Sequence, residues 1–116
     1  MPYICANADS YNDKKYHGES QECVALVKKA CNAPQTSQWK KGIIVKGNNI
    51  TKGTAIATFE GENNKYEGHA AIYISQNNQG IQVIDQWKGH PSQTRIIYFD
   101  NSKTTSNNGY KFHIIE

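Results

Sequence analysis

One helix-like stretch followed by a long run of strand-like stretches is the feature that most constrains the fold of this chain. Residues 20–32 carry apolar side chains at helical spacing, with Ser20 as a candidate N-cap and Asn32-Ala33-Pro34 as a stop signal. Residues 34–42 have the composition of a loop or a short helical turn. Because one or two helices cannot enclose a core by themselves, a sheet must complete the fold.

Strand-like stretches fill most of the chain from residue 54 onward. Their residues are continuously apolar or alternate between apolar and polar, and polar turns rich in Asn and Gly separate the stretches. We therefore expect a single α+β domain over 1–116, with the helix packed on an antiparallel sheet of about five strands. The strand-like stretches cover 54–59, 69–74, 81–84, 95–99 and 110–115, with a further short candidate at 43–45, and a hairpin turn is expected within 75–80.

Cys23 is predicted to lie in the first turn of the helix. There the positive end of the helix dipole and the free backbone N–H groups favour a thiolate, the reactive form of cysteine. Downstream, His69 opens one strand of the predicted hairpin and Asp85 ends the other. The order Cys, His, acid is that of papain-like cysteine hydrolases. We therefore expect Cys23 as the nucleophile, His69 as the base and Asp85 as the group that orients the imidazole.

Each of these residues also has a plain structural interpretation. A cysteine in a helix is often a small buried residue, a histidine at a strand start is often structural, and Asp85 could simply cap a strand. A hairpin with its turn at 77–80 returns residue 85 to the neighbourhood of residue 72 or slightly beyond, which permits the contact with His69 without forcing it. Gln86 is an alternative orienting group, because a neutral amide can also hold an imidazole.

Acyl transfer also needs hydrogen-bond donors for the oxyanion that forms on the substrate carbonyl. The backbone N–H of Cys23 is one candidate. The second is expected from the segment before the helix, where Tyr16 and His17 are preferred over Gln21. Trp87 is a candidate lining residue of a substrate groove.

Composition narrows the possible partners. The 116 residues carry a scattered net charge of +3 and a single arginine, with no RNP-type motif, so a nucleic-acid partner is not expected. No apolar run reaches membrane-spanning length, and residues 1–5 do not have the pattern of a signal peptide. The Cys and His spacings lack the pairs typical of zinc sites, so we expect neither a metal nor another cofactor.

The three cysteines leave the disulfide state open. Cys23 and Cys31 lie about 12 Å apart along a helix and cannot bridge. If Cys23 is the nucleophile, Cys5 and Cys31 could join the N-terminal segment to the helix end. The alternative is that Cys31 is a buried thiol and Cys5 a free one. A disulfide would suit a periplasmic or extracellular protein.

Five blocks of the sequence follow one another at 22–28, 39–42, 53–59, 68–73 and 85–87. In this order they resemble the type VI secretion amidase effectors of the NlpC/P60–CHAP superfamily and the domesticated amidase effectors of ticks and mites. The resemblance extends from about residue 15 to the C-terminus.

The resemblance implies a papain-like fold and hydrolysis of amide bonds in the peptide stems or cross-links of bacterial peptidoglycan. By motif, Cys23 matches the family nucleophile, His69 the base, and Asp85 a third polar position that varies in the superfamily. Gln21 stands where the family often has glycine. The family also implies an antibacterial toxin, secreted or delivered to the target-cell periplasm, and a possible immunity protein that plugs the cleft. We expect a monomer without membrane insertion.

Two other classes of function stay open. A transglutaminase-like or deamidase enzyme acting on protein glutamine would use the same residue order and the same acyl-enzyme chemistry. A catalytically inactive wall-binding module would keep the fold without a reactive Cys23. The scissile bond is also open, because stem-cutting and cross-link-cutting members share these motifs.

Overall fold

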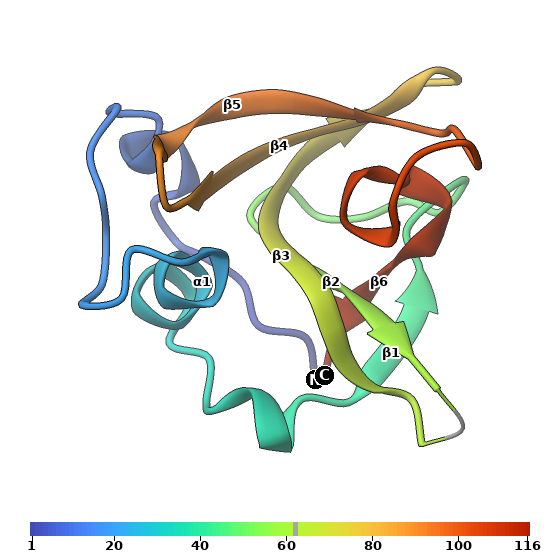
Figure 1. The fold of residues 1–116 in the computed structure, drawn as a ribbon, viewed down its shortest axis with the longest axis horizontal. Coiled ribbons are helices and arrows are strands. Elements are labelled where there is room, and N and C mark those ends of the chain that lie inside the picture. The colour runs from blue at the N-terminus through green and yellow to red at the C-terminus, as the bar shows by residue number, and fades with distance from the viewer. Residues whose placement is uncertain (62) are drawn as a thin grey trace.

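The computed structural model describes residues 1–61 and 63–116 and confirms the α+β class, with a helix packed on an antiparallel sheet (Figure 1). The α-helix is α1 (Cys23–Cys31). The strands are β1 (Lys41–Ile44), β2 (Ala55–Glu60), β3 (Lys65–Gln76), β4 (Gly80–Trp87), β5 (His90–Tyr98) and β6 (Phe112–Ile115). Single 3-10 turns are η1 (Ala8–Tyr11), η2 (Thr36–Gln38), η3 (Thr105–Asn107) and η4 (Gly109–Lys111).

The described strands form one six-stranded sheet in the order β1-β6-β2-β3-β4-β5, where about five strands were expected. The short candidate at 43–45 is realised as β1, at one edge. The C-terminal strand β6 lies between β1 and β2, so the first and last strands of the chain are neighbours in the sheet. Figure 1 shows β3 as a long curved strand that runs past α1.

Two strands begin earlier than the apolar pattern indicates. β3 begins at Lys65 and not at His69, and β5 begins at His90 and not at Arg95. Their first residues are mostly polar and partly or fully exposed. A solvated strand end carries no apolar signal, so periodicity places the boundary where burial begins and not where pairing begins.

The core lies on both faces of the central strands. Ala55, Ala57, Ala70 and Ile72 belong to the cluster under α1, which also holds the fully buried Leu26. The alternating residues Ile56, Ala71 and Tyr73 of β2 and β3 belong to a second cluster on the opposite face, together with Val83 of β4 and Phe112 of β6. Burial on both faces explains why these strands run apolar instead of alternating.

Helix α1 begins at Cys23, two residues later than a Ser20 N-cap would place its first residue. Its N-cap is Glu22, whose side chain makes no capping hydrogen bond, so Ser20 as the N-cap is wrong. The reason lies in the backbone, because Gln21 has a φ of 61° and this left-handed residue separates Ser20 from the helix. Ser20 Oγ instead accepts a hydrogen bond from the Glu22 N–H at 3.3 Å.

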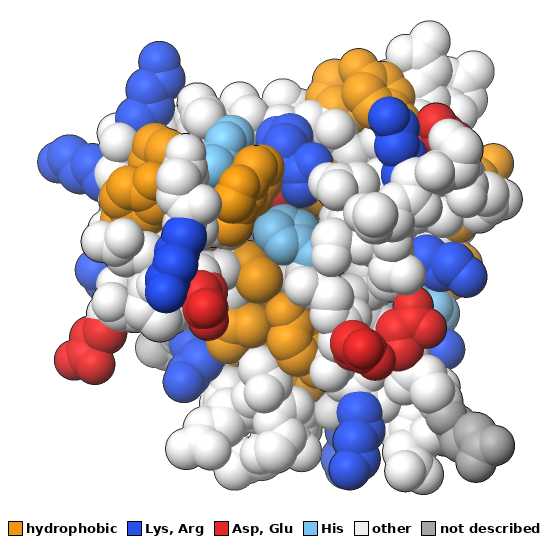
Figure 2. Space-filling view, viewed as in Figure 1, with side chains coloured by type: hydrophobic (Ala, Val, Ile, Leu, Met, Phe, Trp, Pro, Cys, Tyr) orange, Lys and Arg blue, Asp and Glu red, His pale blue; other side chains and the backbone are white. Residues whose placement is uncertain are grey.

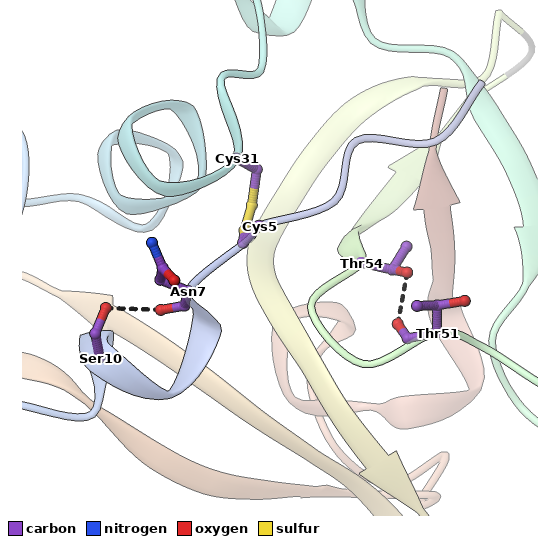
Figure 3. The surroundings of a disulfide bond; sticks show 6 residues. All are labelled: Cys5, Asn7, Ser10, Cys31, Thr51 and Thr54. Atoms are coloured by element: carbon purple, nitrogen blue, oxygen red, sulfur yellow. Dashed lines mark hydrogen bonds between the residues drawn. A yellow bond between two sulfur atoms is a disulfide. The ribbon is translucent and has the colours of Figure 1, made fainter.

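A disulfide joins Cys5 to Cys31 and so connects the N-terminal segment to the last residue of α1 (Figure 3). The N-terminal segment is itself hydrogen-bonded beside β2: the Cys5 N–H donates to the Gly53 carbonyl, and the Ala55 N–H to the Tyr3 carbonyl, both at 2.8 Å. The C-terminal end of α1 is therefore tied to the sheet through covalent and backbone bonds.

The two termini lie side by side, and the N-terminal ammonium of Met1 is 3.4 Å from Glu116 Oε1 (Figure 1). Among the described residues, no helix has the length and apolar character needed to cross a membrane.

Candidate active site

Cys23 is the first residue of α1 and is half-buried. It is also the one free cysteine among the residues that the structure describes. The first backbone N–H groups of a helix have no intrahelical acceptor, and they carry the positive end of the helix dipole. The Cys23 sulfur therefore lies where a negative charge is stabilised and where backbone donors are available to a ligand.

His69 and Asp85 face each other across neighbouring strands. Pairing of Ile72 with Ile84 brings Asp85 back beyond residue 72, toward His69, as the hairpin argument predicted. His69 Nε2 lies 2.8 Å from Asp85 Oδ2, and both residues are buried. Because the carboxylate takes Nε2, Nδ1 is the ring nitrogen left for Cys23.

Cys23 and His69 interact as a thiol–imidazole pair. Burial raises the pKa of the Cys23 thiol, but the hydrogen bond and charge of His69, with smaller contributions from Tyr66 and Ala70, leave that pKa below its usual value. Burial lowers the pKa of His69, yet the hydrogen bond to Asp85 and the interaction with Cys23 raise it to about 9. Both shifts favour a thiolate beside an imidazolium.

Arg95 completes the pairing of Asp85, and sequence reasoning did not assign it a role. Its Nη2 lies 2.6 Å and its Nε 3.0 Å from Asp85 Oδ2, while its Nη1 donates to Asn107 Oδ1 at 3.0 Å. Burial alone raises the pKa of Asp85, but the hydrogen bonds from His69 and Arg95 hold that pKa below its usual value. The carboxylate therefore stays ionised although it is fully buried.

The position of Arg95 could have been found from the hairpin register. Asp85 pairs with Gln93 in β5, so Arg95 is the diagonal neighbour on the same face and within reach of a long side chain. It is also the sole arginine of the chain. An arginine two positions beyond the partner of a proposed catalytic acid is a usable sequence signal once the register is known.

The backbone of His69 is anchored to Thr58 on β2. The His69 N–H donates to Thr58 Oγ1 at 3.0 Å, and Thr58 Oγ1 donates to the Glu67 carbonyl. Gly68, between Glu67 and His69, has a φ of 110°, and a Cβ there would lie 2.5 Å from Thr58 Oγ1. Gly68 is therefore required by the backbone that presents His69.

Tyr66 is a second residue that sequence reasoning missed. Its hydroxyl lies 3.5 Å from Cys23 Sγ. Residues three apart in a regular strand point to opposite faces, yet the side chains of both Tyr66 and His69 reach Cys23. The register of β2 and β3 shifts between these two residues, since Ala57 pairs with Ala70 but Phe59 with Tyr66. No period-2 pattern would place the two side chains together.

The three side chains predicted as oxyanion donors are Tyr16, His17 and Gln21, and the described structure gives them other surroundings. The Tyr16 hydroxyl accepts from the Gly89 N–H at 3.1 Å, and the His17 ring pairs with Asp13 at 2.9 Å. Gln21 is exposed, and its φ of 61° is a left-handed backbone conformation that glycine adopts more readily than other residues. A longer side chain in this conformation costs roughly 1–2 kcal/mol.

Gln86 does not orient His69, but it ties the segment before α1 to β4. Its Oε1 accepts from the His17 N–H at 2.9 Å. Its Nε2 donates to the carbonyls of His17 and Glu22 at 2.7 and 2.9 Å. Since Glu22 directly precedes Cys23, this fully buried amide helps to position the start of the helix.

Trp87 lies beside the His69–Asp85 pair and is 39% exposed. Its ring stacks on His90 at 3.8 Å between centroids, contacts the Arg95 guanidinium at 5.0 Å and approaches His69 edge-on at 6.1 Å. Figure 2 shows histidine side chains near the middle of one face, next to apolar and basic ones. Among the described residues, no three Cys, His, Asp or Glu side chains are grouped to hold a metal ion.

Comparison with known proteins identifies the family of this chain. The sequence model of domesticated amidase effector 2 (Dae2) matches residues 1–115. This chain belongs to the domesticated amidase effector 2 family. The Dae2 match begins at residue 1 and includes the N-terminal segment with Cys5, which the sequence resemblance had left out.

Two relatives show the range of this family. The chain is 45% identical over 103 residues to domesticated amidase effector 2 of Ixodes scapularis, covering 84% of this chain and 72% of that protein. It is 39% identical over 100 residues to the type VI secretion amidase effector 2 protein of Salmonella typhi, covering 83% and 75%. The predicted resemblance to both kinds of amidase effector is thus confirmed.

A solved structure shares the fold. The structure of type 6 secretion amidase effector 2 (Tae2) matches with a TM-score of 0.87 and 33% identity, covering 98% of this chain and 94% of that one. The α+β arrangement of this Dae2 family member is therefore that of a known amidase effector.

Proposed function

We propose that this protein hydrolyses amide bonds of bacterial peptidoglycan, with Cys23 as nucleophile, His69 as acid and base, and Asp85 as the orienting carboxylate. The observation that carries the proposal is the pairing of the half-buried Cys23 with the buried His69, and of His69 with the buried Asp85, in a member of an amidase effector family. The N-terminal helix against the sheet, with the nucleophile before the base in sequence, supports a papain-like arrangement in a single domain over residues 1–116.

Acylation begins with attack of the Cys23 thiolate on the carbonyl carbon of the scissile amide. The S–C bond forms while the carbonyl π electrons move onto oxygen. The electron pair then returns from oxygen to re-form the C=O bond as the C–N bond breaks, and His69 gives its proton to the leaving amine, which departs neutral. The raised pKa of His69, about 9, keeps this proton available at neutral pH.

Deacylation reverses the role of the histidine. Neutral His69 takes a proton from water, the resulting hydroxide attacks the thioester, and the C–S bond breaks to return the thiolate. Asp85 holds Nε2–H throughout, so that Nδ1 keeps facing the sulfur and the imidazolium is stabilised whenever it forms. The proposed cycle uses groups of this chain and water alone.

The biological setting follows from the family. Its relatives are named as domesticated and as type VI secretion effectors, so we propose an antibacterial protein that is secreted or delivered to the periplasm of a target cell. The Cys5–Cys31 disulfide suits such an oxidising compartment. In a bacterial source, a cognate immunity protein covering the Cys23 face is the expected partner, and the enzyme acts as a monomer.

The test is mass-resolved chromatography of muropeptides from purified Gram-negative sacculi after digestion by the wild type and by Cys23→Ala. Loss of cross-linked dimers with intact stems identifies a cross-link endopeptidase, and shortened stems identify a cut within the stem. An unchanged muropeptide pattern with a folded wild-type protein contradicts the proposal. A parallel assay on a glutamine-bearing protein separates peptidoglycan hydrolysis from transglutaminase-like or deamidase chemistry.

A further inference from the structure

We infer that the Tyr66 hydroxyl donates a hydrogen bond to the oxyanion formed during acyl transfer at Cys23, which makes Tyr66 a further catalytic residue. The inference rests on the proposed cysteine amidase chemistry and adds a group to that site. It starts from one contact, the 3.5 Å between the Tyr66 oxygen and Cys23 Sγ.

The ring of Tyr66 is held in place by packing. It lies edge-on against Trp39, with the ring centroids 4.9 Å apart. Trp39 is buried, and its indole N–H donates to the Pro34 carbonyl at 2.9 Å. Tyr66 also packs against the core cluster under α1. The hydroxyl is therefore presented to the sulfur by a fixed ring, which is the preorganisation that an oxyanion donor needs.

The hydroxyl next to the sulfur is well placed for the oxyanion as well. In the tetrahedral intermediate, the oxyanion is attached to the carbon that is bonded to Sγ, so groups around the sulfur also surround the oxyanion. A donor is effective when it lies about 2.7–3.1 Å from the position of that oxygen. Rotation of the O–H bond redirects the proton from the sulfur to this oxygen, and the position of the bound substrate sets the distance between the two oxygens.

The hydrogen bond gains strength as the reaction proceeds. In the resting enzyme the Tyr66 hydroxyl contacts the Cys23 sulfur at 3.5 Å, where the negative charge of the thiolate is spread over a large atom. When the S–C bond forms, the sulfur loses its negative charge and the substrate oxygen acquires it. Transfer of the O–H donor from sulfur to oxygen therefore stabilises the intermediate more than the ground state, and only such differential binding accelerates the chemical step.

Tyr66 also stays protonated during this cycle. Burial, followed by the negative charge and hydrogen bond of Cys23 and the charge of Glu22, raises the pKa of the phenol well above its usual value. The phenol is thus a donor at every pH at which the thiolate–imidazolium pair exists. The backbone N–H of Cys23, at the first position of α1, is the complementary donor.

Among the described residues, none of the three side chains that the sequence predicted as oxyanion donors is hydrogen-bonded to Cys23. The polar groups of Tyr16 and His17 are bonded to Gly89 and Asp13, and Gln21 is exposed to solvent. Tyr66 is the side-chain hydroxyl that the structure places beside the Cys23 sulfur.

The experiment compares two reactions of Cys23 in Tyr66→Phe, with Tyr98→Phe on the exposed end of β5 as the matched control. Alkylation by iodoacetamide displaces iodide at a tetrahedral carbon and forms no oxyanion, so its rate against pH reports the thiolate alone. Acylation by p-nitrophenyl acetate passes through an oxyanion, as does muropeptide hydrolysis. Near-UV circular dichroism verifies that the phenyl ring of Tyr66→Phe still packs on Trp39.

We expect Tyr66→Phe to keep the plateau rate of alkylation within about threefold, while muropeptide hydrolysis falls about 10²-fold, the usual effect of losing one oxyanion donor. The less demanding ester reaction should slow about tenfold. Equal losses in alkylation and acylation would overturn the inference, because Tyr66 would then act on the thiolate only. Unchanged acylation would overturn it too.

The same experiment separates this inference from the proposed function. If the wild type reacts with the ester but leaves muropeptides intact, the proposed substrate is wrong, and the Tyr66→Phe comparison is still read from the ester. If muropeptides are cut at equal rates by the wild type and by Tyr66→Phe, the proposed function stands and the inference about Tyr66 is wrong.

Discussion

His69 and Asp85 stand on neighbouring strands, whereas Cys23 begins a helix that is preceded by residues 12–22 with no regular secondary structure. The register of β3 and β4 sets the histidine and the aspartate relative to each other, and Arg95 and Thr58 hold them from either side. Backbone pairing thus positions this half of the site, called below the strand half.

The other half, called below the helix half, depends on separate ties. Gln86 bonds His17 and Glu22, while Ser92 and Lys15 form a backbone hydrogen bond at 2.9 Å that attaches the segment to β5. The disulfide attaches the far end of α1. The contrast teaches that the base is built into the sheet, while the nucleophile is positioned by the side chain of Gln86, by backbone hydrogen bonds of the segment before α1 and by a disulfide.

The largest effect should come from Cys23→Ser, in which the helix half keeps its shape but loses its thiolate. A serine hydroxyl stays protonated beside this imidazole, so we expect muropeptide hydrolysis to fall about 10⁴-fold or more. Initial rates on sacculi measure the loss, and an unchanged denaturation midpoint shows that folding is intact. Retention of a tenth of the activity would remove Cys23 as the nucleophile.

Asp85→Asn tests the strand half at almost constant shape. Loss of the carboxylate should reduce kcat/KM by about 10²-fold or more, because His69 loses the acceptor that selects its ring tautomer. Asp85→Ala should lose at least as much and also leave the charge of Arg95 without its partner. If both variants hydrolyse muropeptides at the wild-type rate, Asp85 has no part in the mechanism.

The pH dependence of hydrolysis should report the pairing of Cys23, in the helix half, with His69, in the strand half. The raised pKa of His69, about 9, means that the imidazolium persists to that pH and is lost above it, so kcat/KM should fall about tenfold per pH unit on the alkaline side. The stabilisation from this pairing is likewise present below the unfolded pKa and disappears as pH rises through about 9. In Asp85→Asn the alkaline limb should move to lower pH; a limb that stays in place would contradict the role of Asp85.

Gln86→Ala should weaken the helix half and leave the strand half intact. It leaves the carbonyls of His17 and Glu22 without their buried donor, at a cost of about 2–3 kcal/mol in the free energy of unfolding. We expect roughly tenfold slower hydrolysis from displacement of Cys23. Urea denaturation and iodoacetamide alkylation measure both effects, with the exposed Gln82→Ala on the same strand as the control. Equal results for the two variants would contradict the role of Gln86 in positioning the start of α1.

Removal of the disulfide by Cys5→Ser with Cys31→Ser should have the smallest effect on activity. The link closes a loop over a sequence separation of 26, so its loss should lower the free energy of unfolding by about 3 kcal/mol. Hydrolysis at 25 °C should stay within about threefold, because Gln86 and the core still position α1. A loss of activity without a loss of stability would show that the disulfide positions Cys23 directly.

The same contrast separates what could be predicted from what could not. The hairpin that brings Asp85 toward His69 follows from apolar periodicity and turn residues, and the structure has it. The start of α1 was misplaced because Gln21 adopts a left-handed backbone that no helix-start pattern signals. The early starts of β3 and β5 were missed because exposed strand ends have no apolar pattern.

By itself the sequence determined the residue order of the site, the α+β class and the family resemblance, because helix propensity, strand periodicity and short motifs are written in neighbouring residues. The tertiary structure alone decided that Tyr66 lies at the Cys23 sulfur, that Arg95 holds Asp85, that Gln86 ties the segment before α1, and that Cys5 pairs with Cys31. These contacts join residues far apart in the chain. They depend on strand register, on an irregularity at Gly68 and on the packing of α1, which local patterns do not encode.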